Sequence, residues 1–206
     1  MRRLQLDHIQ EKDWVSALPV KAIQFGEGNF LRGFVDWMIH RMNAQQLFNG
    51  RVTVIQPIEH GAGEVLNEQD GLYTLLIRGV HNGELVQERE LVTSMHRVIN
   101  PYQQYEAYLQ TALNPRLRFV FSNTTEAGIV YSPQDRYEDV PPSTFPGKLT
   151  VWLHKRYEAF AGDPDKGVIV LPCELIDRNG DELRQIVLRL ADEWKLGDAF
   201  IEWVTH

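Results

Sequence analysis

Residues 25–34 read F-G-E-G-N-F-L-R-G-F, with Gly26 and Gly28 standing between a short apolar run and a segment of helical spacing. The apolar run before them, residues 21–25, is typical of a buried strand. A glycine pair between a strand and a helix brings backbone N–H groups and the positive end of the helix dipole to one point, where a phosphate can bind. In such a turn Gly26 permits the sharp bend, and Gly28 lets the ligand approach the backbone. Glycine pairs also occur in ordinary turns, so the prediction of a dinucleotide site depends on the surrounding fold.

Strand-like and helix-like segments alternate along the rest of the chain. Strands are predicted at 21–25, 51–57, 117–121 and 167–171, and helices at 29–46, 101–113, 145–160 and 181–194. Residues 73–93 differ, because apolar and polar residues alternate there around Asn82-Gly83, which is typical of an antiparallel hairpin. Strands that alternate with helices form mainly parallel sheets with right-handed crossovers. The predicted fold class is therefore α/β, a Rossmann-like doubly wound sheet with a hairpin insertion, and this context favours the dinucleotide interpretation of the glycine pair.

The composition of the chain excludes several classes of protein. Of its 206 residues, 43 % are hydrophobic and 24 % are charged, as in a globular domain with a large core. The net charge of -7, without a basic patch, argues against binding to nucleic acid or to an anionic membrane surface. No segment reads as a signal peptide or a membrane span, so we expect a cytoplasmic protein. Because Cys173 is the only cysteine and the seven histidines are scattered, neither a disulfide nor a metal site is predicted.

The end of the second strand leaves the type of dinucleotide open. A carboxylate at this position normally binds the adenosine ribose hydroxyls. Here the strand ends in Gln56-Pro57-Ile58-Glu59. Gln56 can donate to a ribose and Glu59 can approach one, but neither residue is diagnostic. Since no arginine cluster follows the strand, NAD is favoured over NADP.

Four longer stretches carry a resemblance to a known family. They read F-G-E-G-N-F-L-R-G-F-V-D-W, Q-D-G-L-Y-T, F-V-F-S-N-T-T-E-A-G-I and P-C-E-L-I-D-R-N-G. In combination they resemble the amino-terminal half of the mannitol dehydrogenase family of polyol-specific long-chain dehydrogenases, in particular its tagaturonate reductase (altronate oxidoreductase) branch. The resemblance covers about residues 20–203. It implies NAD-linked, metal-independent interconversion of a hexuronate and its hydroxy acid, tagaturonate and altronate, or fructuronate and mannonate in the sibling branch.

The resemblance also implies which residues bind the cofactor. Arg32 would help to position the phosphates, and the second loop would lie against the ribose and nicotinamide. Short polar groups at the carboxyl end of a strand suit this role, although Asn-Thr-Thr is equally typical of a solvated turn. The residues implied are Gly26, Gly28, Asn29, Phe30, Leu31 and Arg32 in the first loop, and Asn123, Thr124, Thr125 and Glu126 in the second.

Cys173-Glu174-Leu175 occupies the position of a Cys-Asp-Asn triplet in the mannitol dehydrogenase branch, where the amide polarises the reacting oxygen. Leu175 cannot donate a hydrogen bond, so that role must belong to another residue. Glu174 and Cys173 are therefore the substrate-side candidates. A buried, locally paired carboxylate is an equally good interpretation of Glu174, and a lone cysteine is more often a small core residue.

We name no catalytic residue. Hydride transfer to a carbonyl needs an acid that protonates the developing alkoxide. The family implies a lysine from a helical domain that follows the nucleotide domain. The lysines considered for this role are at positions that indicate helix surface or loop, namely Lys148, Lys155, Lys166 and Lys195. We therefore expect residues 1–206 to be a single NAD-binding domain without its carboxyl-terminal catalytic domain, with little or no activity towards a hexuronate.

Two further expectations follow from an incomplete enzyme. The face left open by the missing domain would be apolar, so a homodimer through that face is expected. An alternative function is a stand-alone, non-catalytic module that binds or senses NAD(H). A methyltransferase-like domain also uses a Gly-x-Gly turn, but the hairpin at 73–93 does not fit its simplest layout.

Overall fold

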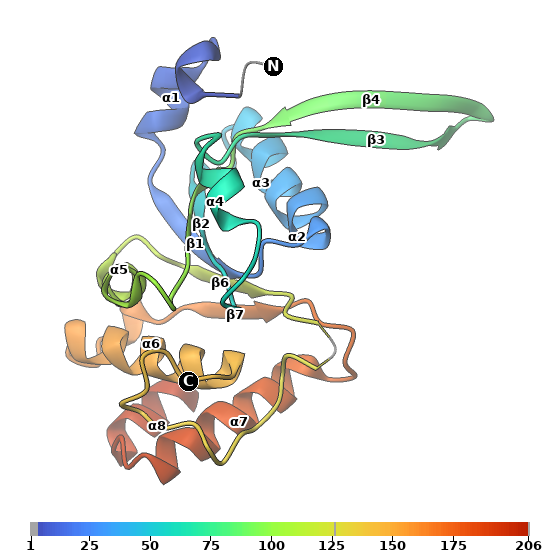
Figure 1. The fold of residues 1–206 in the computed structure, drawn as a ribbon. Coiled ribbons are helices and arrows are strands. Elements are labelled where there is room, and N and C mark those ends of the chain that lie inside the picture. Colours follow the sequence, from blue (N-terminus) through green and yellow to red (C-terminus); the bar gives the residue numbers. More distant parts are fainter. Residues whose placement is uncertain (1–3, 126, 206) are drawn as a thin grey trace.

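The computed structural model describes residues 4–125 and 127–205, which are built around a five-stranded parallel sheet (Figure 1). Its strands, in spatial order, are β5 (Met95–Ile99), β2 (Arg51–Ile55), β1 (Val20–Phe25), β6 (Phe119–Ser122) and β7 (Ile169–Pro172). All neighbouring pairs are parallel. The chain passes from β1 outwards through β2 to β5 and then returns to the other side of β1 for β6 and β7. The strand order therefore reverses between β1 and β6, and the predicted Rossmann-like fold class is confirmed.

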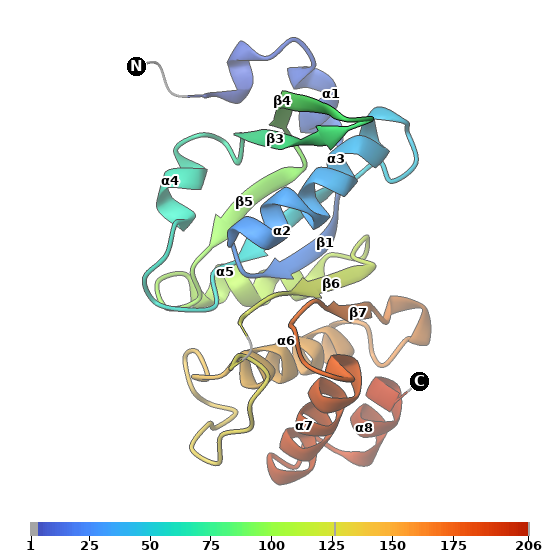
Figure 2. The same cartoon turned by 90° about the vertical axis from the view of Figure 1, so that its right-hand side faces the viewer.

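Helices cover both faces of the sheet (Figures 1 and 2). One face carries α2 (Asn29–Gly33), α3 (Val35–Ala44) and α4 (Gly63–Asn67). The other carries α5 (Tyr105–Gln110) and α6 (Phe145–Ala159), with α7 (Asn179–Glu193) and α8 (Asp198–Thr205) packed beyond α6. The short helix α1 (Lys12–Ala17) precedes β1, and turns of 3-10 helix occur at Leu6–His8, Thr111–Leu113 and Pro164–Lys166. Among the described residues, no helix is both long and apolar enough to cross a bilayer.

The alternation of side chains along β1 divides the core into two halves. Ala22 points to the face covered by α2 and α3, whereas Ile23 and Phe25 point to the face covered by α5 and α6. Phe25 packs against the rings of Tyr108 and Phe145, with centroids 6.2 and 4.9 Å away. Because both faces of the strand are covered, β1 is apolar along most of its length.

The predicted hairpin insertion is confirmed as β3 (Tyr73–His81) and β4 (Glu84–Val92). Asn82 and Gly83 have φ values of 51° and 85°, as the tight turn between the strands requires. The hairpin extends away from the sheet, and only its base is anchored (Figure 1). There the Tyr73 hydroxyl donates to the Arg32 carbonyl at 2.7 Å. The base of the hairpin is therefore tied to α2, directly behind the glycine turn.

The helix predicted over 29–46 is divided into α2 and α3. The break lies at Phe34, whose φ of -121° and ψ of -74° are not helical. The buried stripe consists of Leu31, Val35 and Ile39. The apolar residues Phe30, Phe34 and Met38, which have the same spacing, are instead 47, 46 and 39 % exposed. The short turn from β1 decides which of the two stripes faces the sheet.

Other boundaries also differ from the predicted ones. The helix predicted at 101–113 starts later, at Tyr105. Before it, the N–H groups of Gln103 and Gln104 donate to the Asn100 carbonyl and form a turn. The strand predicted at 167–171 lies at the sheet edge, where Ile169 and Leu171 remain half exposed. Strand β5 was not predicted, because its buried residues do not alternate regularly.

Arg156 ties α6 to the loops that enter β6 and β7. It is completely buried, and burial lowers the pKa of its guanidinium to about 10, so the group stays charged at neutral pH. Its nitrogens donate to four backbone carbonyls at 2.6–3.2 Å, those of Lys166, Ala112, Asn114 and Leu117. A single cation thus satisfies the carbonyls of two loops that cannot use strand hydrogen bonds.

We expect Arg156→Met to lower the free energy of unfolding by about 3 kcal/mol or more, because four carbonyls lose their donor and two of those hydrogen bonds are buried. Urea denaturation measures the change. Arg189→Met is the matched control, since Arg189 pairs with Glu193 on the exposed side of α7 and its loss should change the free energy of unfolding far less. Equal losses in the two variants would contradict a special role for Arg156.

Candidate cofactor-binding site

The predicted glycine turn joins β1 to α2 at the carboxyl edge of the sheet (Figure 2). Gly26 has a φ of +116°, and its N–H donates to the Ile55 carbonyl at 3.0 Å. A Cβ at Gly26 would lie 2.8 Å from the backbone oxygen of Asn123, which follows β6. The turn therefore presses against the exit of β6, at the point where the strand order reverses, and only glycine fits there.

Gly28 is in a different environment from Gly26. Its φ of -68° is open to any residue, and no atom lies within 4 Å of a Cβ built on it. Gly28 precedes the first residue of α2, and the first N–H groups of a helix have no partner inside it. The turn thus offers backbone donors next to open space, as the prediction for Gly28 requires.

The other predicted residues of the first loop point in different directions. Arg32 Nη2 donates to Asn29 Oδ1 at 2.6 Å, and the guanidinium lies 5.7 Å from the Tyr73 ring centroid. This arrangement keeps a cation beside the turn. Phe30 is half exposed. Leu31 is buried against the sheet, at the position where dinucleotide-binding turns usually have a third glycine.

Gln56 is held by its own loop. Its side chain is buried, and Nε2 donates to the carbonyls of Ile58 at 2.9 Å and Glu59 at 3.1 Å. Its Oε1 accepts a hydrogen bond from the Gly63 N–H at 3.1 Å. The amide therefore shapes the loop after β2 in this conformation, and its contact with a ribose stays a prediction.

Glu174 joins the loops after β6 and β7. One carboxylate oxygen accepts from the Ser122 hydroxyl, and the other from the N–H and the hydroxyl of Thr124, all at 3.0 Å. Asn123 Nδ2 donates to the Cys173 carbonyl at 2.8 Å. The structure thus brings these predicted residues together at one edge. Glu174 is paired within the protein, which is the second of the two interpretations given above.

The remaining residues of these loops are more exposed. Thr125 has a φ of 80°, a strained value for a β-branched residue. Leu175, which stands where the mannitol dehydrogenase branch has an asparagine, is 85 % exposed and faces solvent. Burial and the charge of Glu174 raise the pKa of the Cys173 thiol, which is therefore not activated as a nucleophile. Glu126 lies outside the described residues.

Lys148 is not at the surface position expected from the sequence. It is completely buried, and burial lowers its pKa to about 8, against the opposing effect of Asp135. Its Nζ donates to the Tyr102 hydroxyl at 3.1 Å and to the Ser143 carbonyl at 2.8 Å. The ammonium group is therefore occupied by hydrogen bonds to other residues of the protein. Over residues 4–125 and 127–205, no cluster of His, Cys, Asp and Glu side chains could hold a metal ion.

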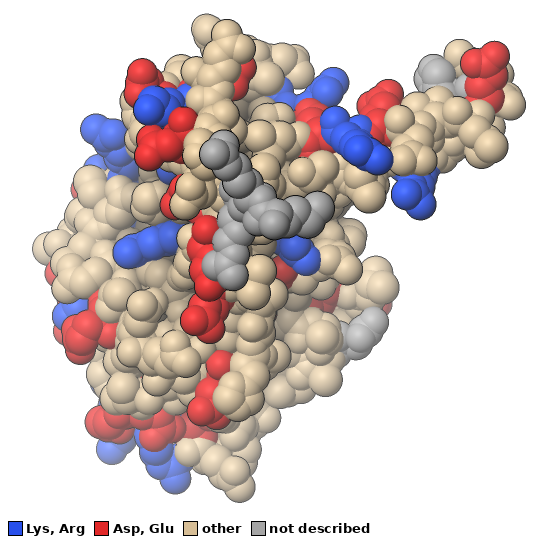
Figure 3. Space-filling model, turned by 45° about the horizontal axis from the view of Figure 1, so that its top comes forward, with Lys and Arg blue, Asp and Glu red and all other residues tan. Residues whose placement is uncertain are grey.

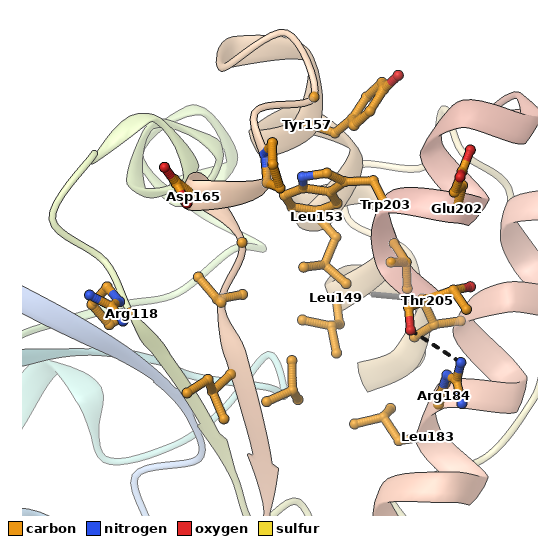
Figure 4. Close-up of a pocket in the computed structure, with 18 of the residues that line it drawn as sticks. Arg118, Leu149, Leu153, Tyr157, Asp165, Leu183, Arg184, Glu202, Trp203 and Thr205 are labelled. Carbon is orange, nitrogen blue, oxygen red and sulfur yellow. Dashed lines mark hydrogen bonds between the residues drawn. The ribbon is translucent and has the colours of Figure 1, made fainter.

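A cavity of the described part of the chain lies away from these loops (Figure 4). It measures about 1020 Å³ and is bordered by the edge strand β7 and by α6, α7 and α8. Apolar side chains such as Leu149, Leu153 and Trp203 line it, and Arg184 closes one side by donating to the Thr205 carbonyl at 3.3 Å. None of the predicted cofactor residues lines this cavity.

Two buried polar side chains behind the glycine turn were not singled out from the sequence. Gln24 lies in β1 and Asp36 in the first turn of α3. The sequence did contain two indications of this pair. One is a glutamine inside an apolar strand, and the other is an aspartate beside a buried helical stripe. Neither residue type is expected in a core unless it has a partner.

Several known proteins are similar to this chain in sequence. Residues 20–206 match the family described as the mannitol dehydrogenase Rossmann domain. The chain is 52 % identical over 192 residues to altronate oxidoreductase of Bacillus subtilis (strain 168), covering 93 % of this chain and 40 % of that protein. It is 52 % identical over 189 residues to altronate oxidoreductase of Yersinia enterocolitica, covering 91 % and 39 %.

Two solved structures have a similar fold. Mannitol 2-dehydrogenase of Pseudomonas fluorescens, in a ternary complex with NAD and D-mannitol, superimposes with a TM-score of 0.76 at 21 % identity, over 93 % of this chain and 40 % of that one. A substrate-free D-sorbitol dehydrogenase gives a TM-score of 0.74 at 19 % identity, over 93 % and 41 %. The chain therefore spans about two fifths of the length of the relatives it matches.

The two glycines of the turn are expected to respond differently to alanine. Gly26→Ala should lower the free energy of unfolding by about 2 kcal/mol, because the methyl group meets the Asn123 carbonyl at a positive φ. Gly28→Ala should change it by about 0.5 kcal/mol or less. It should, however, weaken NADH binding about tenfold or more, because the methyl group fills the space beside the backbone donors.

Thermal unfolding and quenching of tryptophan fluorescence by NADH measure the two effects, with S-adenosylmethionine as the comparison ligand. Unchanged NADH affinity in Gly28→Ala would contradict the assignment of the turn. Quenching by S-adenosylmethionine in place of NADH would favour the methyltransferase alternative.

Proposed function

Because the chain belongs to the mannitol dehydrogenase family, we propose that it is the NAD-binding domain of an oxidoreductase that interconverts tagaturonate and altronate by hydride transfer. The observation that carries the proposal is the glycine turn at the reversal of strand order, pressed against the loop after β6. This edge is where open α/β sheets bind ligands. The choice of substrate is supported by the 52 % identity to altronate oxidoreductases. An intracellular, cytoplasmic location fits this metabolic role.

Each side of the site has a distinct task in this proposal. NAD, when bound, accepts or supplies the hydride. The backbone donors at Gly28 and Asn29 bind the pyrophosphate, and Arg32 compensates part of its charge. Asn123 and Thr124 border the part of the cofactor nearer the reacting carbon, and Glu174 keeps their loop in place.

The proposed reaction also needs a proton donor. Lys148 is committed to Tyr102 and Ser143, and we assign no donor among the described residues. We propose that the donor belongs to a helical catalytic domain outside residues 1–206, which fits their span of two fifths of the matched relatives. Without that domain, water reaches the nicotinamide half of the site, and binding and turnover are weak.

Two alternatives remain within the same geometry. A fructuronate reductase, which forms mannonate, would use the same nucleotide domain, because the substrate carboxylate is bound largely outside it. A stand-alone NAD(H)-binding or sensing module would need no catalytic domain. Neither alternative is a nucleic-acid binder, and on the face shown in Figure 3 Lys and Arg are scattered among Asp and Glu.

We expect the purified chain to reduce tagaturonate with NADH at less than about one hundredth of the rate of the complete Bacillus subtilis relative, because the proton donor is missing. Adding the separately produced carboxyl-terminal part of that relative should restore activity. Absorbance of NADH measures the rate, with fructuronate as the parallel substrate. A full rate from the chain alone would contradict the proposal, and no recovery in trans would favour the sensing module.

We also propose that the chain forms a homodimer through apolar side chains near the carboxyl edge of the sheet. The rings of Phe30 and Phe34 lie tilted to each other with centroids 5.3 Å apart, and both side chains remain half exposed. The double variant Phe30→Ser/Phe34→Ser should raise the dimer dissociation constant at least about tenfold in sedimentation equilibrium. Leu85→Ser, at the far end of the hairpin, is the control and should leave the dimer unchanged. A monomeric unmodified chain would contradict the proposal.

A further inference from the structure

A connected group of buried polar side chains lies directly behind the glycine turn. Gln24 and Asp36 are both completely inaccessible to solvent. Gln24 Nε2 donates to the Gly26 carbonyl at 2.9 Å and to Asp36 Oδ2 at 3.3 Å. A single amide group therefore links the backbone of the turn to a carboxyl group on α3.

Several atoms of this group lack a partner. Gln24 Oε1, Asp36 Oδ1 and Arg32 Nε are buried without a hydrogen bond. Such atoms are rare in folded proteins because each one costs free energy. An ionised Asp36 offers only acceptors, so it cannot satisfy Gln24 Oε1. A proton on Asp36 Oδ1 turns that atom into a donor, and a carboxylic acid complements both atoms of the amide.

The surroundings of Asp36 also favour its neutral form. The charged and titratable groups that bear on it are Arg32 from α2 and Tyr73 from β3. Gln24 from β1 is uncharged, as is Ser94, whose hydroxyl donates to the Asp36 carbonyl at 2.7 Å. Burial raises the pKa of Asp36 to about 7, although the Gln24 hydrogen bond and the charge of Arg32 oppose the rise.

We propose that Asp36 is a positioning residue of the cofactor turn: as a neutral acid it holds the Gly26 carbonyl through Gln24, and its ionisation weakens cofactor binding. The inference rests on the proposed NAD function. The hydrogen bond from Gln24 fixes the Gly26 carbonyl, and with it the turn whose N–H groups at Gly28 and Asn29 would bind the pyrophosphate. An ionised Asp36 would place a negative charge behind the turn that receives a doubly charged pyrophosphate.

The affinity for NADH should fall as Asp36 ionises. Below about pH 7 Asp36 is neutral and the affinity for NADH is at its full value. As the pH rises above 7, NADH must either bind beside the ionised Asp36 carboxylate or bind together with a proton that Asp36 takes up. The dissociation constant for NADH should therefore rise about tenfold between pH 6 and pH 8.5.

The test is the pH profile of NADH binding in the Asp36→Asn variant. Asparagine has the shape and the neutral charge of the protonated acid, and it can both accept from and donate to the Gln24 amide. The variant should bind NADH at pH 8.5 as tightly as the unmodified chain does at pH 6, with a flat profile. Asp165→Asn, near the start of β7, should keep the sloping profile. A flat profile in the unmodified chain, or a slope that persists in Asp36→Asn, overturns the proposal.

Unfolding without NADH tests the neutral acid separately from the proposed function. The folded pKa of about 7 lies above the ordinary value of 3.8, so stability from the bound proton is present below pH 4 and is lost as the pH rises to 7. The unmodified chain should therefore lose stability relative to Asp36→Asn across that window. A constant difference between the two overturns the proposal. Absence of NADH binding at pH 6, with the stability effect intact, would instead refute the NAD function.

Discussion

The structure depends on the contact between Gly26 and the carbonyl of Asn123. The chain leaves β1, turns and begins α2 within a few residues, at the point where β6 also ends. A side chain at Gly26 would collide with the neighbouring backbone, and its φ of +116° is open only to glycine at low cost. The close approach brings the loops after β1 and β6 together, so one turn can serve both parts of a dinucleotide.

Polar contacts, rather than apolar packing, keep the two sides of this edge in place. Glu174 accepts three hydrogen bonds from Ser122 and Thr124, which fixes the loop after β6 against the loop after β7. On the other side, Gln24 holds the Gly26 carbonyl. Buried polar groups specify geometry more sharply than apolar contacts do, because a displaced partner leaves an unsatisfied atom. The edge is therefore preorganised by the protein before any ligand arrives.

In the proposed function, cofactor binding and protonation of the substrate belong to different parts of the enzyme. The domain holds and orients a dinucleotide, which depends on backbone donors and a rigid sheet. Protonation of an alkoxide needs an acid that faces the substrate, and Lys148 faces the interior instead. Burial lowers the pKa of Lys148, and a substrate cannot reach a buried ammonium group. A shifted pKa by itself therefore does not identify a catalytic group.

The sequence by itself determined the features that arise within short segments. Asn82-Gly83 and its alternating flanks specify the hairpin, and Gly26 and Gly28 mark the turn between β1 and α2, because backbone conformation at these sites depends on local sterics. Only the tertiary structure decided which helical stripe is buried, that Glu174 is paired, and that Asp36 lies behind the turn. These outcomes depend on contacts between residues far apart in the chain, such as Ser122 and Glu174, which are 52 positions apart, and no local pattern encodes which distant side chain will supply the partner.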